Sequence, residues 1–162
     1  MSVWQPAYIG VGSNVDDPSA QVLRAVAKLG ELSATRVVRV SSLYGSRPFG
    51  PVAQPDFVNA VAGVLTQLAS RALLAELQEL ETSLGRPVQH EKWGPRVIDL
   101  DLLVYGREHS SAADLVLPHP GIGERNFVLR PLADVAPDLN VPGIGRVAGL
   151  AARASAAGIW LL

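Results

Sequence analysis

The sequence predicts one α+β domain with an antiparallel-rich sheet and helices packed on its faces. Hydrophobic periodicity places the segments in the order strand, helix, strand, strand, helix, strand. The segment between the second and third strands contains Pro48, Pro51 and Pro55, so it is too rich in proline to form a helix. This order is typical of the split βαβ, or ferredoxin-like, arrangement, whereas a doubly wound parallel sheet needs a helix at that point.

The first half of the chain is expected to hold three strands and one helix. Residues 8–11 are expected to form a short buried strand, followed by a turn at Gly12-Ser13-Asn14. Asp17 can cap a helix with Pro18 at its first position, and Gly30 is expected to end that helix. The next segments are expected to be a strand over residues 36–43, a loop over residues 45–56 and a strand over residues 57–65.

The second half begins with an amphipathic helix. Leucines at positions 73, 77, 80 and 84 recur at three- and four-residue steps, which predicts a helix over residues 70–84 that ends at Gly85. A polar loop over residues 86–95 then leads into a strand over residues 97–105. The later segments are expected to be a short strand over residues 115–117, helices over residues 125–129 and 148–157, and a loop over residues 137–145.

Length and composition restrict the class of protein. The 162 residues fit one domain spanning residues 1–162. The apolar segments are all too short for a membrane span, and residues 1–8 do not resemble a secretory signal. The absence of cysteine excludes disulfides and thiolate metal sites and is compatible with a cytoplasmic location. A net charge of −1 argues against nucleic acid as the partner.

Asp99 and Asp101 are the most informative pair in the sequence. They lie two residues apart on an expected strand, so their side chains share one face about 7 Å apart, while Leu100 and Leu102 face the other side. Two such carboxylates repel each other, and a hard divalent cation relieves that repulsion. Mg²⁺ binds one or two carboxylates and completes its shell with water and phosphate oxygens. The pair indicates either a magnesium–phosphate site or a solvated acidic strand face.

The residues around this pair favour the phosphate site. Arg86, Lys92 and Arg96 are close in sequence, and such cations bind phosphate oxygens. Trp93, in the same polar segment, either packs on the core or closes over a flat ligand. His119 lies between two prolines and is either structural or a hydrogen-bond donor to a phosphate.

Phe57 and Asn59 place an aromatic ring and an amide on one strand face. An amide both donates and accepts, as recognition of an amide-bearing heterocycle requires, although Asn59 is equally typical of a turn or bulge. Residues 10–14, Gly-Val-Gly-Ser-Asn, match neither a P-loop nor a dinucleotide fingerprint, so nucleotide binding by those routes is not supported.

Residues 92–103 read Lys-Trp-Gly-Pro-Arg-Val-Ile-Asp-Leu-Asp-Leu-Leu. This block resembles the signature of the 6-hydroxymethyl-7,8-dihydropterin pyrophosphokinase family of folate biosynthesis. Further matches occur in residues 8–14, 54–60, 81–86, 117–120 and 125–132, so the resemblance covers roughly residues 7–140. The chain departs from the family pattern at Arg47, Val88 and Asp114.

The resemblance implies an activity and a set of site residues. Members transfer pyrophosphate from ATP to the hydroxymethyl group of the pterin and release AMP, with two Mg²⁺ ions on the phosphates. The resemblance implies that Asp99 and Asp101 bind metal and, with Arg86 and Arg96, are catalytic. The implied ATP contacts are Gln78, Glu81, Arg86, Trp93, Arg96, Leu102, His119 and Arg125. The implied pterin contacts are Ser46, Phe49, Phe57, Asn59, Trp93 and Phe127.

We expect a monomer whose partners are these small molecules, without nucleic acid or membrane. Two other functions stay open at this stage. One is a different Asp-X-Asp metal enzyme, a phosphohydrolase or a sugar-nucleotide transferase, although Phe57, Asn59 and Phe127 favour a flat heterocycle. The other is a non-catalytic ferredoxin-like ligand sensor, which has no need of two aspartates beside Arg96.

Overall fold

The computed structural model describes residues 3–48, 50–85 and 97–162. The first half contains β1 (Gln5–Ser13), α1 (Pro18–Leu29), β2 (Thr35–Val40), β3 (Tyr44–Ser46), β4 (Phe57–Thr66) and α2 (Ser70–Ser83). The second half contains β5 (Asp99–Tyr105), β6 (Ser110–Ala112), β7 (Leu115–Leu117), α3 (Asn126–Val135), β8 (Asn140–Val141), β9 (Gly145–Arg146), α4 (Val147–Arg153) and β10 (Ile159–Leu161). No helix in these described ranges is long and apolar enough to cross a membrane.

The main sheet has the topology that the sequence predicts. Its strand order is β10-β3-β4-β1-β5, β2 also pairs with β4, and neighbouring strands are antiparallel. The two short strands β2 and β3 pair with different ends of β4, β2 with residues 62–66 and β3 with residues 57–59. Together they take the place of the expected second strand, which confirms the split βαβ order.

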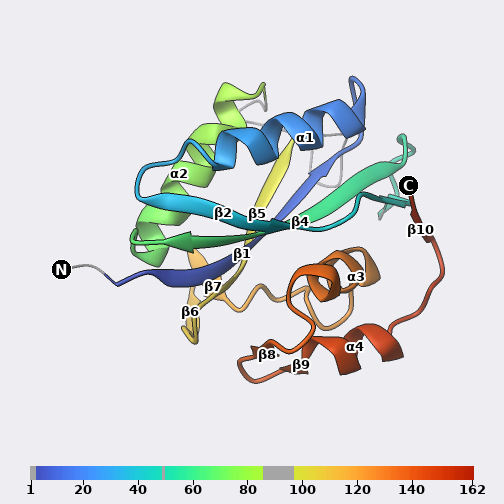
Figure 1. The fold of residues 1–162 in the computed structure, drawn as a ribbon. Coiled ribbons are helices and arrows are strands. Elements are labelled where there is room, and N and C mark those ends of the chain that lie inside the picture. Colours follow the sequence, from blue (N-terminus) through green and yellow to red (C-terminus); the bar gives the residue numbers. More distant parts are fainter. Residues whose placement is uncertain (1–2, 49, 86–96) are drawn as a thin grey trace.

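Helices cover both faces of this sheet (Figure 1). The helices α1 and α2 pack on one face, against a core that includes Ile9 of β1 and Leu77 of α2. On the other face α3 packs against β4, and α4 packs against α3. The second core lies there and includes Leu103 of β5 and Leu132 of α3. The α+β fold with helices on both faces is therefore confirmed.

The two long helices form where the sequence predicts them. The α1 helix starts after Asp17, whose carboxylate accepts the N–H of Ala20 at 3.4 Å, and it buries Val22 and Leu29. The α2 helix buries leucines at positions 73, 77 and 80 and ends at Ser83, one residue before the expected end. Gly85 follows with φ +107°, a conformation that favours glycine.

Several sequence-based boundaries were wrong. The first strand extends to Ser13, beyond the expected turn, and β3 lies in part of the segment expected to be a loop. The expected short helix continues to Val135 through Pro131, because burial of its apolar face outweighs the cost of an internal proline. The loop expected over residues 137–145 contains β8 and part of β9. The last helix ends at Arg153 instead of residue 157, and β10 was not expected.

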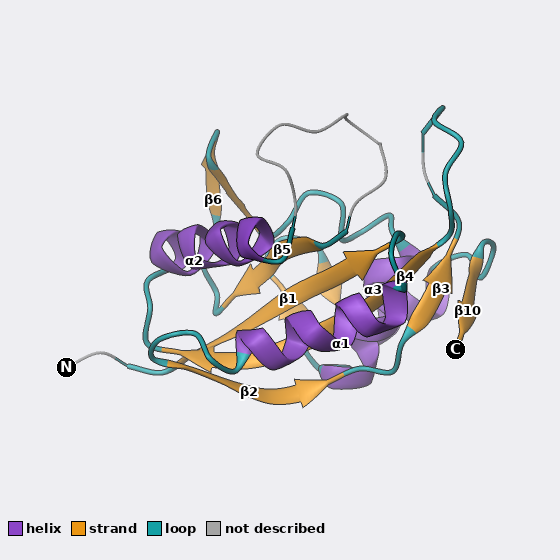
Figure 2. Ribbon diagram, turned by 90° about the horizontal axis from the view of Figure 1, so that it is seen from above, coloured by secondary structure: helices purple, strands orange, loops and turns teal. Residues whose placement is uncertain are grey.

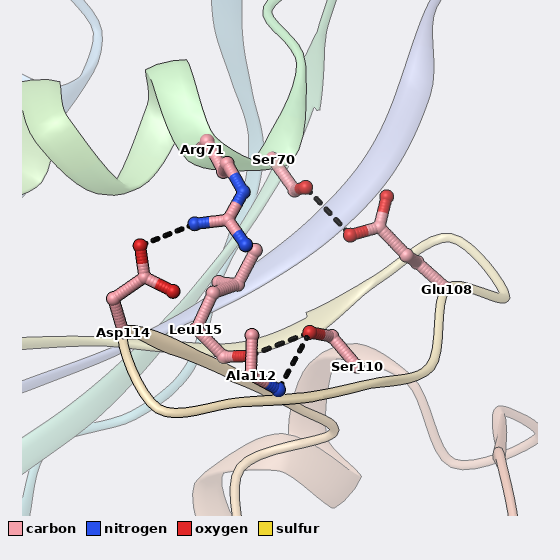
Figure 3. Close-up of polar contacts among 7 residues, drawn as sticks. All are labelled: Ser70, Arg71, Glu108, Ser110, Ala112, Asp114 and Leu115. Atoms are coloured by element: carbon pink, nitrogen blue, oxygen red, sulfur yellow. Dashed lines mark hydrogen bonds and ion pairs between the residues drawn. The ribbon is translucent and has the colours of Figure 1, made fainter.

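The β6–β7 hairpin is attached to the start of α2 by polar contacts (Figure 3). Ser70 donates to Glu108 at 2.6 Å, and Arg71 forms an ion pair with Asp114. The hydrogen bond from Arg71 lowers the pKa of Asp114. Asp114, one of the departures from the family pattern, therefore has a partner on α2.

Asp134 joins α3 to the sheet. Its carboxylate accepts the Tyr44 hydroxyl at 2.8 Å and the Ser42 N–H at 3.2 Å. Burial raises the pKa of Tyr44 to about 12, and the hydrogen bond to Asp134 contributes to that rise. The neutral hydroxyl thus fixes α3 against β3.

This contact predicts a dependence of stability on alkaline pH. A tyrosine in an unfolded chain loses its proton near pH 10, whereas folded Tyr44 keeps it up to about pH 12. The stabilisation from Tyr44 is therefore complete below pH 10 and is lost as the pH rises through 12. We expect the melting temperature to fall more between these pH values in the wild type than in Tyr44→Phe. Burial also raises the pKa of Tyr8 and that of Tyr105, but both tyrosines are present in the variant as well. Parallel curves would therefore contradict the role given to Tyr44.

Candidate active site

A cavity of about 300 Å³ lies on the α3 side of the sheet. Strands β1, β4 and β5 contribute to it, as do β3, the residues after β7 and the start of α3. Its lining residues are Gly10, Val11, Gly12, Ser46, Arg47, Gln54, Phe57, Asn59, Ala60, Val61, Asp99, Asp101, Leu103, His119, Arg125, Phe127 and Val128.

Two glycines of β1 keep the central part of this cavity open. Ile9 and Val11 of β1 belong to the core under α1 and α2, so Gly10 and Gly12 face the cavity. A Cβ added to Gly12 would lie 3.2 Å from Oδ1 of Asn59, which is closer than ordinary contact. Glycine at this position lets the Asn59 amide lie against the β1 backbone.

Asp99 and Asp101 share one face of β5, as the sequence predicts. They pair with Gly12 and Gly10 of β1, and both line the cavity half-buried. Leu100 between them is 4% exposed and belongs to the core on the α2 side. The alternation of the strand therefore brings two carboxylates to a concave surface next to backbone glycines.

Glu81 of α2 contacts the backbone of β5 between these two aspartates, from the side away from the cavity. Its carboxylate accepts the backbone N–H of Leu100 at 2.8 Å, and the residue is only 8% exposed. Within the main sheet β5 is an edge strand, so this N–H points away from β1 and needs a partner outside the sheet. Glu81 supplies that partner and connects α2 to the backbone between Asp99 and Asp101.

An irregularity in β5 brings His119 into the cavity. The pairing with β1 skips Leu103, and the Leu103 carbonyl accepts the N–H of His119 at 2.8 Å. Nδ1 of His119 accepts the N–H of Gly121 at 3.1 Å, so a neutral ring carries its hydrogen on Nε2. Burial, then the positive charge of Arg125, lower the pKa of His119, against a smaller opposite effect of Asp99. The neutral imidazole thus offers a single N–H donor.

Arg125 lies beside this histidine and over the ring of Phe127. Its guanidinium carbon is 5.9 Å from the centre of the Phe127 ring, which is a cation–π distance. A Cβ on Gly121 would lie only 2.5 Å from Nε of Arg125, so the absence of a side chain there makes room for the arginine. A cation and an N–H donor therefore line the same cavity as the carboxylates.

The other end of the cavity combines an amide with aromatic rings. Nδ2 of Asn59 donates to Oγ of Ser46 at 2.7 Å, and both residues are buried. Phe57 and Phe127 line the same cavity. Flat apolar surfaces around a fixed amide suit a planar ligand with hydrogen-bonding edges.

Comparison with known proteins identifies the family. A family model described as 7,8-dihydro-6-hydroxymethylpterin-pyrophosphokinase (HPPK) matches residues 8–137. The chain belongs to the HPPK family. A 2-amino-4-hydroxy-6-hydroxymethyldihydropteridine pyrophosphokinase of Haemophilus influenzae is 45% identical over 136 residues, 84% of each chain. The protein of the same name from Pseudomonas aeruginosa is 46% identical over 138 residues, 85% of each chain.

Solved structures agree on the fold. The chain matches Plasmodium falciparum HPPK-DHPS with a TM-score of 0.73 at 12% identity, a level that supports the fold alone. The match covers 94% of this chain and 45% of that one, so the chain spans less than half of that protein. The HPPK resemblance drawn from sequence motifs is thus confirmed for the family and the fold.

The cavity brings together eight of the residues that the HPPK resemblance implies: Ser46, Phe57, Asn59, Asp99, Asp101, His119, Arg125 and Phe127. Gln78, Glu81 and Leu102 do not line it. Leu102 instead lies in the core, 5% exposed, and Glu81 holds β5. Phe49, Arg86, Trp93 and Arg96 lie outside the described residues.

Sequence reasoning missed several residues of this HPPK cavity. The alternation of β1 could have placed Gly10 and Gly12 on the cavity face, had that strand been extended to Ser13. Gln54 lines the cavity and accepts a hydrogen bond from the buried Asn14 at 2.8 Å. No periodic signal marks Gln54, because it lies in an irregular segment.

Proposed function

We propose that this chain transfers pyrophosphate from ATP to the hydroxymethyl group of 6-hydroxymethyl-7,8-dihydropterin. One observation carries the proposal: a single cavity joins the Asp99–Asp101 face of β5 to the Asn59 amide and its two phenylalanines. The first part suits metal-bound phosphates and the second suits a flat heterocycle. Membership of the HPPK family supports the same activity.

In the proposed reaction the hydroxymethyl oxygen attacks the β-phosphorus of ATP. The new bond joins that oxygen to the β-phosphorus, the bond from the β-phosphorus to the oxygen of the α-phosphate breaks, and AMP leaves with that oxygen. The hydroxyl proton is released. The products are AMP and the pterin diphosphate, so the reaction balances.

The residues of the chain bind and orient the two substrates. Asp99 and Asp101 would hold the two Mg²⁺ ions, because hard cations prefer carboxylate oxygens and complete their shells with water and phosphate oxygens. When bound, Mg²⁺ neutralises charge on the bridging phosphate oxygens. His119 donates its Nε2 hydrogen to a phosphate oxygen, and Arg125 supplies a second, charged donor.

The pterin end is assigned by the same reasoning. The Asn59 amide pairs with the pterin edge, Ser46 orients that amide, and Phe57 and Phe127 contact the ring. Arg86 and Arg96 are proposed as phosphate contacts, and Trp93 and Phe49 as pterin contacts. Gln78, Glu81 and Leu102 remain proposed neighbours of the nucleotide.

We further propose that residues 1–162 form one domain that acts as a monomer in the cytoplasm.

A product assay tests the proposed reaction. The purified chain with ATP, Mg²⁺ and hydroxymethyl-dihydropterin is expected to form AMP in equal amount to the pterin diphosphate, and chelation of Mg²⁺ is expected to stop it. ADP as the product would show ordinary monophosphoryl transfer instead. Turnover of ATP without pterin would support a phosphohydrolase, and ligand binding without turnover would support a sensor.

The contact of Glu81 gives a separate prediction. In Glu81→Ala the buried N–H of Leu100 loses its partner, which costs roughly 1–3 kcal/mol of stability. Because that N–H lies between the two aspartates, the Mg²⁺ concentration for half-maximal rate is expected to rise about 10-fold. Glu81→Gln keeps an acceptor oxygen and is expected to restore most of the Mg²⁺ affinity. An unchanged Mg²⁺ requirement in Glu81→Ala would limit Glu81 to a folding role.

A further inference from the structure

Residues 155–162 contain β10, the edge strand of the main sheet, which lies next to the cavity-lining strand β3. Strand β10 lies beside β3 (Figure 2) and pairs with it antiparallel. Ile159 lies opposite Ser46. The pairing continues beyond β3 at both ends. The N–H of Arg47 donates to the Gly158 carbonyl and the N–H of Leu162 donates to the Leu43 carbonyl, each at 3.0 Å. The segment therefore holds β3 along its whole length.

Trp160 adds a close side-chain contact to this pairing. It lies opposite Gly45, and a Cβ added to that glycine would lie 2.3 Å from the indole ring. The ring thus packs directly against the β3 backbone, one residue before Ser46. Only a residue without a side chain allows this approach.

The same segment is attached to the opposite wall of the cavity through Asn126. This residue stands between Arg125 and Phe127 at the start of α3. Its Nδ2 donates to the carbonyls of Ser155 at 2.7 Å and Ala157 at 2.9 Å. Both carbonyls lie after the end of α4 at Arg153, in the segment that leads to β10.

We propose that residues 155–162 form a clasp that sets the distance between β3 and the start of α3, and thereby positions the pterin. This inference rests on the proposed function. Asn126 and Trp160 are positioning residues in this account, because they act through Phe127 and Ser46 rather than on the substrate. The clasp lies beyond residues 8–137, which the family model matches.

The clasp is expected to affect the pterin more than ATP. Without β10, the three-residue strand β3 becomes the edge of the sheet and is held by β4 alone. Ser46 then loses its fixed place beside Asn59, and Phe127 loses the support of Asn126. Asp99 and Asp101 lie on β5, at the opposite edge of the sheet from β10, where β5 pairs with β1. The metal-binding end therefore keeps its geometry, and Arg125 is the only proposed phosphate contact of the described cavity that adjoins Asn126.

Steady-state kinetics of Trp160→Ala and Asn126→Ala test the clasp. Each variant is expected to raise the KM for hydroxymethyl-dihydropterin about tenfold, because a small misplacement of binding groups is costly. The KM for ATP is expected to stay within about twofold of the wild type in Trp160→Ala, and to rise less than the pterin KM in Asn126→Ala, where Arg125 adjoins the substitution. Trp160→Phe keeps a flat ring on Gly45 and is expected to restore most of the pterin KM.

Trp4→Ala is the matched control. Trp4 is 36% exposed and Trp160 is 39% exposed, but Trp4 stacks on Arg36 away from the cavity. The control is expected to leave both KM values unchanged. An unchanged pterin KM in Asn126→Ala and Trp160→Ala, or an equal rise in both KM values, would overturn the clasp. If Trp160→Ala does not fold, Asn126→Ala and Trp160→Phe decide alone. A wild-type chain without pterin-dependent AMP formation would instead refute the proposed function.

Discussion

Replacing Asp99 or Asp101 by asparagine is expected to lower the rate of AMP formation by about 10³-fold or more. Each substitution removes one negative charge from the cavity face of β5 and leaves the shape of the side chain almost unchanged. Charge stabilisation by a bound metal is worth several kcal/mol in phosphoryl transfer, and each 1.4 kcal/mol corresponds to a factor of about ten in rate. The loss should therefore appear in kcat at saturating Mg²⁺ and ATP.

Folding is expected to survive both substitutions. Asp99 and Asp101 lie close together on one strand face, so removing one charge also removes a repulsion. Either variant should still unfold in one cooperative transition when Mg²⁺ and ATP are absent. Addition of Mg²⁺ and ATP should raise the melting temperature of the wild type more than that of the variants.

Asp138→Asn is a suitable control for the loss of one carboxylate. Asp138 is exposed and forms an ion pair with Arg146, and it does not line the cavity. Its substitution should change kcat by less than a factor of about two, because exposed ion pairs contribute little. Full activity in both Asp99→Asn and Asp101→Asn would contradict the metal role of the pair, whatever family the chain belongs to.

The parts of the fold that sequence predicted well are those with a clear period. The leucines of α2 recur at helical spacing, and the alternation of β5 separates its aspartates from Leu100. One face of each element is buried in a large core, so the pattern of apolar residues reports its structure directly. The shared face of Asp99 and Asp101 followed from that alternation alone.

Other parts depend on contacts between distant segments. Strand β3 has three residues and no useful alternation, and its neighbour β10 lies more than a hundred residues later. The skip at Leu103 that brings His119 into the cavity is a local change of register without a sequence signal. Similarly, no sequence pattern reveals that Glu81 of α2 accepts the N–H of Leu100 and so holds an edge strand. Such roles become visible only when the elements are packed together.

The second large effect is expected at Asn59, the only asparagine among the lining residues of the described cavity. Asn59→Ala removes an amide that is 8% exposed and positioned by Ser46. Two neutral hydrogen bonds at roughly 1.4 kcal/mol each correspond to about a 10²-fold loss in kcat/KM for the pterin. The KM for ATP should change little, since the aspartates remain in place.

Asn59→Asp separates the shape of the side chain from its hydrogen bonding. The carboxylate keeps the size of the amide but cannot donate, and it adds a buried charge, so it should lose at least as much pterin affinity as alanine does. Asn140→Ala, an exposed asparagine on β8, is the control and should behave like the wild type. If Asn59→Asp instead bound the pterin normally, an acceptor alone would be enough, and the donor role of the amide would be wrong. If the variant raised the KM for ATP and left pterin binding unchanged, the amide would face the nucleotide. The assignment of the two ends of the cavity would then have to be reversed.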